Sequence, residues 1–298
     1  MAVALGYGKA ATLERRAERR PSPVIDALRR DRFAAAALLT ILAIVLIALL
    51  APVLPLASPT KTDFGARLQS PLSPGHLLGT DQLGRDVLSR IVWGARVSLV
   101  VGALAAAIAA AAGSLVGLVA GYFGGTADTV IMRVIDVMLA FPNVLLAIAL
   151  VAALGPGLTN AMIAIAVANI SFYARNVRGN VLALRNQPFV EAGKSAGASS
   201  RWILWRHILP NVVAPILVLV SMNIGWMITE TAGLSFLGLG AQPPTADWGS
   251  MLADGRQFIT VKFHLVTIPG IMILILVLAL NVLGDALRDA LDPRLRNR

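Results

Sequence analysis

The sequence predicts an all-α, polytopic membrane protein with six transmembrane helices, cytoplasmic N- and C-termini and a helical loop in the cytoplasm. Three observations predict this class. First, 57% of the 298 residues are apolar and only 14% are charged, whereas soluble chains carry about 25% charged residues. Second, uncharged runs long enough to cross about 30 Å of hydrocarbon recur along the chain. Third, Lys and Arg residues are dense in some of the intervening segments and sparse in others.

The uncharged runs, together with the residues that divide or end them, predict six spans. Gly155-Pro156-Gly157 divides the run 137–174 into a third and a fourth span, because this tripeptide cannot continue a helix. Glu230 and Asp285 end the fifth and sixth spans. The remaining spans are 34–51, 97–127, 212–229 and 265–284.

The distribution of basic residues gives the orientation. Eighteen of the 26 Lys and Arg residues lie before the first span, between the fourth and fifth spans, or after the sixth. Since cytoplasmic segments are enriched in these residues, we place both termini and the loop 175–211 in the cytoplasm. The net charge of +10 then reflects this asymmetry and contact with anionic lipid head groups, and no nucleic-acid partner is expected. A cleaved signal peptide is also not expected, because the polar leader is too long.

These features divide the chain into four segments. A basic cytoplasmic tail covers 1–33, and the first span with an external segment covers 34–96. A core of five spans covers 97–284 and contains the cytoplasmic loop at about 186–210. A second cytoplasmic tail covers 285–298.

The external segment before the second span is rich in proline, so we expect an extended and stiff chain there. Thr80 or Asp81 is then expected to cap a short helix that contains Gly84 to Trp93. We expect this helix to lie along the membrane interface.

Small residues recur every four positions in the second span, at Ala109, Gly113, Gly117 and Gly121. This spacing places them on one helix face, where they allow another helix to approach closely. We interpret the face as a helix-packing surface and not as a substrate path.

Few charged residues lie near the spans. Arg133 and Asp136 are expected at the cytoplasmic end of the third span, paired along the helix, because each would cost about 2.5–3.5 kcal/mol at the bilayer centre. A proton-coupled secondary carrier would need more intramembrane ionisable groups. That alternative rests on Asp128, Arg133, Asp136 and Glu230.

The cytoplasmic loop has features of two short helices. Pro188 suits a first helical turn and Gly197 can end the helix, so we expect it at about 188–196. Ala192, Gly193 and Ala196 leave one side nearly bare. Such a helix can fit a groove on a soluble partner, although a solvated or lipid-surface helix remains an alternative. A membrane anchor that recruits a partner without transport is a second functional class.

The second short helix is expected to begin at Ser199 or Ser200 and to run to Leu209. Pro210 is expected to end it, because the residue before a proline is disfavoured in a helix. The fifth span would begin after this break.

This loop also carries a resemblance to a known family. It keeps the spacing Glu-Ala-Ala, three residues, Gly, nine residues, Ile, one residue, Leu-Pro, with Gly193 in place of the second Ala and His207 in place of Ile. The loop therefore resembles the EAA loop of permease subunits of binding-protein-dependent ABC importers. The segments 76–90 and 234–245 are similar to the second permease of the dipeptide and oligopeptide branch. The resemblance extends over most of the chain from about residue 27.

The resemblance implies that the chain is one permease of an ATP-driven importer in the plasma (inner) membrane of a prokaryote. Its partners would be a homologous second permease, two cytoplasmic ATPase domains, separate or fused, and an external substrate-binding protein. ATP and Mg²⁺ would bind to the ATPase, with no cofactor on this chain. Closure of the ATPase domains would drag the docked loop and rock the attached spans. The implied docking residues are Glu191, Ala192, Gly193, Ala196, Gly197, Leu209 and Pro210.

The external segments are expected to contact the binding protein or to form an outer gate. The candidate residues are Asp81, Arg85, Gln242 and Trp248. Trp248 can equally serve as an interfacial anchor. Neither segment identifies the cargo, because a dipeptide, an oligopeptide, a metal chelate or haem would each occupy a cavity shared with the second permease.

No catalytic or metal-binding motif is found in the sequence. The fragment Gly193-Lys194-Ser195 resembles the end of a phosphate-binding loop, but Pro188 stands where that motif requires Gly. The sequence has no Cys, and its three His residues are too scattered to suggest a zinc site. Ser, His and Asp lie in no catalytic motif. We therefore expect ATP hydrolysis on a partner chain.

Overall fold

The computed structural model describes residues 31–291, and within this range the regular structure is helical apart from two isolated β-bridges. This confirms the all-α class. Most of the expected N-terminal tail and the end of the C-terminal tail lie outside the described residues. The seven longer helices are α3 (Arg32–Leu50), α4 (Val87–Phe123), α5 (Gly125–Leu139), α6 (Asn143–Leu154), α7 (Leu158–Arg185), α10 (Leu209–Phe236) and α12 (His264–Leu291).

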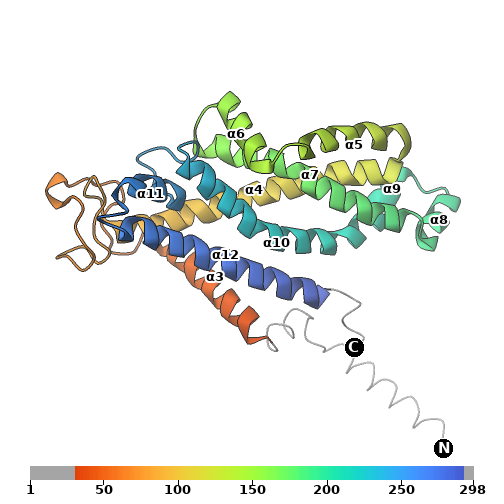
Figure 1. Cartoon of the computed structure of the whole chain (residues 1–298). Helices are drawn as coiled ribbons and strands as arrows, with labels where there is room; N and C mark the ends of the chain where they lie inside the picture. The colour runs from red at the N-terminus through yellow and green to blue at the C-terminus, as the bar shows by residue number, and fades with distance from the viewer. Residues whose placement is uncertain (1–30, 292–298) are drawn as a thin grey trace, which may run out of the picture.

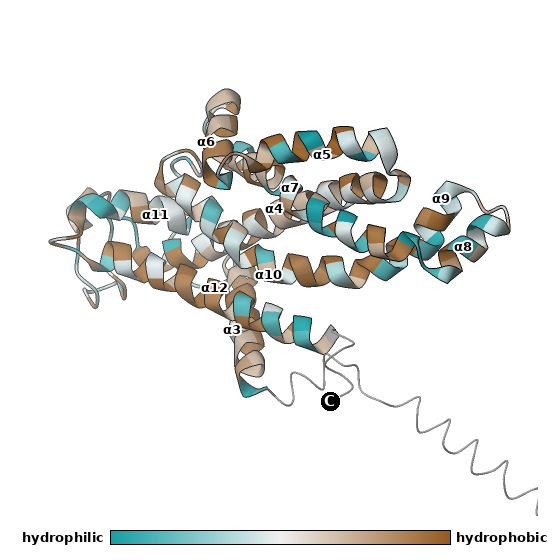
Figure 2. Cartoon of the chain, turned by 45° about the vertical axis from the view of Figure 1, so that its right-hand side comes forward, coloured by the Kyte–Doolittle hydropathy of each residue, from teal (hydrophilic) through white to brown (hydrophobic). Residues whose placement is uncertain are grey.

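Shorter elements join these helices. They are α8 (Pro188–Ser195), α9 (Ser200–Ile203), the π-helical turn η2 (Leu204–Ile208), α11 (Trp248–Gly255) and the 3₁₀ turns η1 (Phe64–Ala66) and η3 (Arg256–Phe258). α8 and α9 lie at one end of the bundle, and α11 lies at the other end with the segment between α3 and α4 (Figure 1). Figure 2 shows hydrophobic residues along the long helices and hydrophilic residues gathered at α8 and on the segment between α3 and α4.

Four helices of the described range are long and apolar enough to cross a membrane: α3, α4, the continuous helix Ser200–Phe236, and α12. The pair α5 and α6, bent by 92°, gives a fifth span if it is counted as one. α7 contains the expected fourth span but is less apolar, because it carries polar side chains such as Asn169 and Arg175. By length and composition the chain is therefore polytopic, with four to five candidate spans.

The second and third spans both differ from the prediction. The helix of the second span ends at Phe123, before Gly124 with a φ of +67°, so the uncharged run 97–127 is not one helix. The next helix breaks before Pro142, which has no backbone N–H to donate and constrains the residue before it. α6 has only 12 residues, or about 18 Å at 1.5 Å per residue, too short to cross the bilayer alone. A straight third span within 137–154 was therefore a wrong prediction.

The start of α4 also corrects the prediction of a separate helix from Gly84 to Trp93. Gly84 has a φ of +73°, and the helix begins at Val87, where the Asp86 side chain accepts a hydrogen bond from the Ser89 amide. From there it runs unbroken for 37 residues, or about 55 Å, which exceeds the thickness of the hydrocarbon core.

Three expected ends lie inside helices, and one of them is Asp285, because α12 continues beyond it to Leu291. Pro210 does not stop the second loop helix, because the π-helical turn η2 precedes it and the helix continues into α10. Such a turn changes the local hydrogen-bonding pattern and accommodates a proline. Glu230 was expected to end the fifth span, but α10 continues to Phe236 and the Glu230 side chain is buried within the bundle.

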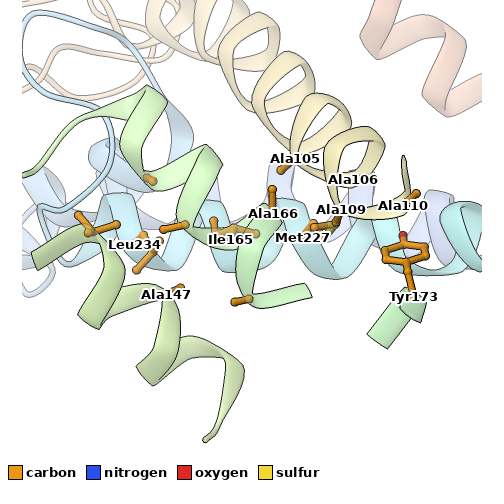
Figure 3. Packing of buried hydrophobic residues seen from close by; sticks show 14 residues of the cluster. Ala105, Ala106, Ala109, Ala110, Ala147, Ile165, Ala166, Tyr173, Met227 and Leu234 are labelled. Carbon is orange, nitrogen blue, oxygen red and sulfur yellow. The ribbon is translucent and has the colours of Figure 1, made fainter. Parts of the chain in front are cut away.

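The core is formed where α4 packs along α7. A Cβ atom on Gly113 would lie 2.6 Å from the carbonyl oxygen of Ile170, and one on Gly117 would lie 2.5 Å from that of Ala174. A Cβ atom on Gly121 would lie 2.8 Å from the Val181 Cβ. The glycine stripe is therefore the line along which the two backbones meet. Toward the middle of α4 the contact continues in an apolar cluster with Ala105, Ala106, Ala109, Ile165, Tyr173, Met227 and Leu234 (Figure 3).

Candidate functional site

The loop predicted to be cytoplasmic, at about 186–210, folds as α8 followed by the helix that leads into α10. Pro188 occupies the first turn of α8, Glu191 lies in the same turn, and Lys194 lies in the last. The helix ends at Ser195, and Gly197 follows with a φ of +75°. Acidic residues near a helix N-terminus and basic residues near its C-terminus both interact favourably with the helix dipole. The predicted helix at 188–196 is confirmed to within one residue.

α8 is anchored from behind by apolar contacts. Val190 is fully buried in a cluster formed by α4, α7, η2 and α10. Its partners include Val181 of α7, Ile208 of η2 and Val212 of α10. A displacement of α8 must therefore act on the adjoining ends of both α7 and α10.

The outer side of α8 is smooth and accessible. Glu191, Ala192, Ala196 and Gly197 are all exposed. Gly193 is half-buried and faces the second helix, where a Cβ atom would lie 3.8 Å from Ile203 and 3.9 Å from the His207 ring. These are ordinary contact distances, so the Ala of the family pattern would fit at this position.

The second helix begins with Ser199 as its N-cap, whose hydroxyl accepts a hydrogen bond from the Trp202 amide at 3.3 Å. His207, which replaces the apolar residue of the pattern, lies in an aromatic group. Its ring centre is 4.8 Å from that of Trp202 and 5.9 Å from that of Phe189. Leu209 packs behind the loop and Pro210 is exposed at the start of α10. Only part of the implied docking set therefore lies at the tip of α8.

An open groove on the second loop helix, about 470 Å³ in volume, was not predicted from the sequence. Trp202 and Trp205 are half-exposed on its wall. The spacing of aromatic and basic residues in 199–206 was the signal that could have indicated it. The groove is lined by Ser199, Arg201, Trp202, Trp205 and Arg206.

Ion pairs join α5 to α7 near the loop. Arg178 forms two contacts of 2.6 Å with the Asp128 carboxylate, and Arg175 lies 2.6 Å from Asp136. Asp136 therefore pairs with α7, and the predicted pairing with Arg133 along one helix was wrong. The reason is geometric, since the bend after α5 places this helix alongside α7.

The opposite end of the molecule is held by a buried ionic cluster. The Arg85 side chain lies 2.6 Å from Asp81 and 3.0 Å from Asp254 of α11, and Arg90 lies 3.5 Å from Asp81. Asp81 and Arg85 are 6% and 3% exposed. These two residues thus fasten the segment before α4 to α11 and offer little surface to a binding protein.

Trp248 and Gln242 occupy contrasting positions. Trp248 is fully buried, and its indole N–H donates to the Ile91 carbonyl at 2.9 Å. In this structure it is therefore neither an interfacial anchor nor a partner contact. Gln242 is exposed, and its amide donates to the carbonyls of Gly238 and Gly240.

Comparison with known proteins identifies the family to which this sequence belongs. Residues 113–297 match the family described as the binding-protein-dependent transport system inner membrane component. The chain belongs to this family. Residues 23–71 match the N-terminal transmembrane domain of oligopeptide transport permease C.

Curated relatives are similar in sequence to this permease over about nine tenths of its length. It is 47% identical over 270 residues to the dipeptide transport system permease protein DppC of Alkalihalophilus pseudofirmus, covering 91% of this chain and 88% of the relative. It is 46% identical over 269 residues to the glutathione transport system permease protein GsiD of Pectobacterium atrosepticum, covering 90% and 89%. A chain in an inward-facing structure of the MetNI methionine ABC transporter shares the fold, with a TM-score of 0.53 at 19% identity over 67% of this chain and 96% of that chain.

These matches confirm the resemblance inferred from the loop and from segments 76–90 and 234–245. The permease is a non-catalytic, multi-pass transport subunit of an ABC importer in the bacterial inner membrane. Dependence on a binding protein and on an ATPase follows from the family. Family membership favours the importer over both the proton-coupled carrier and the non-transporting anchor.

Proposed function

We propose that this permease forms half of a translocation path for a dipeptide or a small peptide of the glutathione type. The proposal is supported by relatives at 46–47% identity that are named for dipeptide and glutathione transport. The other half of the path belongs to a homologous second permease, and an external binding protein delivers the peptide to the end that carries α11. Half of the cavity thus lies on another chain, which contributes to the choice of cargo.

We further propose six spans with both termini in the cytoplasm: α3, α4, the bent pair α5–α6, α7, α10 and α12. The antiparallel packing of α3 against α12 supports this arrangement, since the start of α3 and the end of α12 lie at the same end of that helix pair (Figure 1). The enrichment of Lys and Arg in the segments assigned to the cytoplasm agrees with it.

The observation that carries the proposed mechanism is the combination of a smooth, exposed outer face on α8 with a buried apolar support behind it. Ala192, Ala196 and Gly197 allow a partner to approach closely, while Val190 ties α8 to the ends of α7 and α10. Two cytoplasmic ATPase domains, fused or separate, bind ATP and Mg²⁺, and one of them docks on α8. Their closure displaces α8, and this motion rocks α7 and α10 against the rest of the path.

The test is a charge placed on the docking face. Ala192→Arg should leave the amount of protein in the membrane unchanged and should lower ATP-driven dipeptide uptake in reconstituted vesicles at least tenfold, with loss of the co-purifying ATPase. Thr126→Arg is the matched control, because Thr126 is also exposed but lies on α5. Wild-type uptake and ATPase recovery in the Ala192→Arg variant would contradict docking on α8.

A further inference from the structure

Polar side chains follow the seam between α7 and α10 through the membrane region. The Asn169 amide donates to the Glu230 carboxylate at 2.9 Å. Closer to the cytoplasmic loop, the Asn223 amide lies 3.5 Å from the Tyr173 hydroxyl. Asn176 continues the row on α7 and is exposed. The seam therefore runs from a buried acid to an exposed amide.

Glu230 is the unusual member of this row. Its side chain is 8% exposed, one carboxylate oxygen accepts from Asn169, and the other, Oε1, is buried without a hydrogen-bond partner among residues 31–291. No Lys or Arg of that range pairs with it. A buried carboxylate is costly unless it is paired and hydrogen-bonded. The Trp226 indole is a neutral N–H donor beside this carboxylate, so a charged partner would have to come from outside residues 31–291.

The surface beside Glu230 indicates where such a donor comes from. Trp226 lies one turn earlier on α10 and is 54% exposed, and Asn176 is exposed on α7. Exposed polar side chains in a membrane protein face water or another chain and not lipid. This edge of the seam is therefore suited to be a wall of the water-filled path.

We propose that Glu230 binds the α-ammonium group of the peptide during translocation, with Asn169 holding the carboxylate in place. Aromatic faces also attract cations, so Trp226 is placed to take part at the exposed edge. The inference rests on the proposed peptide-import function. In this conformation Oε1 is covered, so the site opens only when the helices around it move, and both α7 and α10 lead directly to the α8 loop.

A purely structural role makes a different prediction. If Glu230 only joins α7 to α10, then Gln, which keeps the size of the side chain and the acceptor for Asn169, should be tolerated, and only Leu should be harmful. If Glu230 binds an ammonium group, Gln and Leu should be equally harmful, because both lack the negative charge.

The experiment uses the whole importer, with second permease, ATPase and binding protein, in reconstituted vesicles with dialanine as the probe. We expect Glu230→Gln to lower uptake at least tenfold, to the level of Glu230→Leu, in complexes that still contain the second permease and the ATPase. Glu230→Asp, which keeps the charge, should retain at least threefold more uptake than Glu230→Gln, and this pair decides the question if the Leu variant does not fold.

Three results would overturn the inference. The first is near-normal uptake by Glu230→Gln, which would make Glu230 a helix-positioning residue. The second is equal uptake by the Asp and Gln variants. The third is loss of the second permease from the purified Glu230→Gln complex, which would assign the donor to that subunit. A wild-type importer that accumulates no dialanine would instead contradict the proposed function.

Discussion

Two helices pack against α7 in opposite ways. α4 meets it along three glycines, with backbone in contact with backbone. α5 has one buried residue, Ile135, and is joined to α7 by two ion pairs. Close packing is lost over a fraction of an ångström, whereas the attraction between two charges declines slowly with distance. We infer that α4 and α7 move as one body when α8 is displaced, while α5 can shift against α7 without losing its attachment.

The largest effect is expected from closing the gap between α4 and α7. A Cβ atom in Gly117→Ala would lie 2.5 Å from the Ala174 carbonyl oxygen and 3.0 Å from the Arg178 amide nitrogen, and neither backbone atom can move alone. Overpacking of this kind costs about 1–3 kcal/mol. We expect the variant to unfold at a lower temperature in detergent than the wild type.

Gly179→Ala is the matched control for this change. Gly179 is exposed on α7, and a Cβ atom there would meet nothing within 4 Å. Because alanine is a better helix former than glycine, this variant should be up to about 1 kcal/mol more stable. If the two variants have the same stability, α4 and α7 are not in the close contact described.

A smaller effect is expected at the Arg178–Asp128 pair. The contact is bidentate, and the side chains are 31% and 17% exposed. A double-mutant cycle with Arg178→Met and Asp128→Asn should give a coupling energy of about 1 kcal/mol from thermal unfolding, decreasing at high salt. A salt-independent coupling would mean that α5 is held against α7 by packing. It would contradict the inference that α4 and α5 are attached to α7 in different ways.

The glycine stripe could be predicted from the sequence because its period of four is a local property of one helix. The identity of the partner helix could not be predicted, because nothing in residues 113–121 distinguishes α7 from the other spans. The α8 helix could likewise be predicted, because Pro188 and Gly197 mark its ends.

The wrong predictions concern charged residues whose partners or burial depend on contacts between distant parts of the sequence. Asp136 has Arg133 within helical reach. Gly124 and Pro142 mark the helix breaks on either side of α5, but they do not give the direction of the bend that brings Arg175 closer. Asp81 and Arg85 looked like surface residues because a charged pair in an external segment is normally solvated. Asp254, which pairs with Arg85, lies 169 residues later in the chain, so the burial of this pair could not be predicted from the local sequence.

The smallest effect distinguishes the two candidate partners of Asp136. The Arg175–Asp136 contact is half-exposed, so it should contribute only about 0.3 kcal/mol to stability. Its local effect is more informative and can be measured by amide hydrogen exchange of α5. Arg175→Met should speed exchange around residues 132–139, because α5 loses an attachment to α7, whereas Arg133→Met should leave it unchanged. Equal acceleration by both variants would mean that pairing within α5 competes with pairing to α7, and that α5 is less firmly attached to α7 than the two ion pairs indicate.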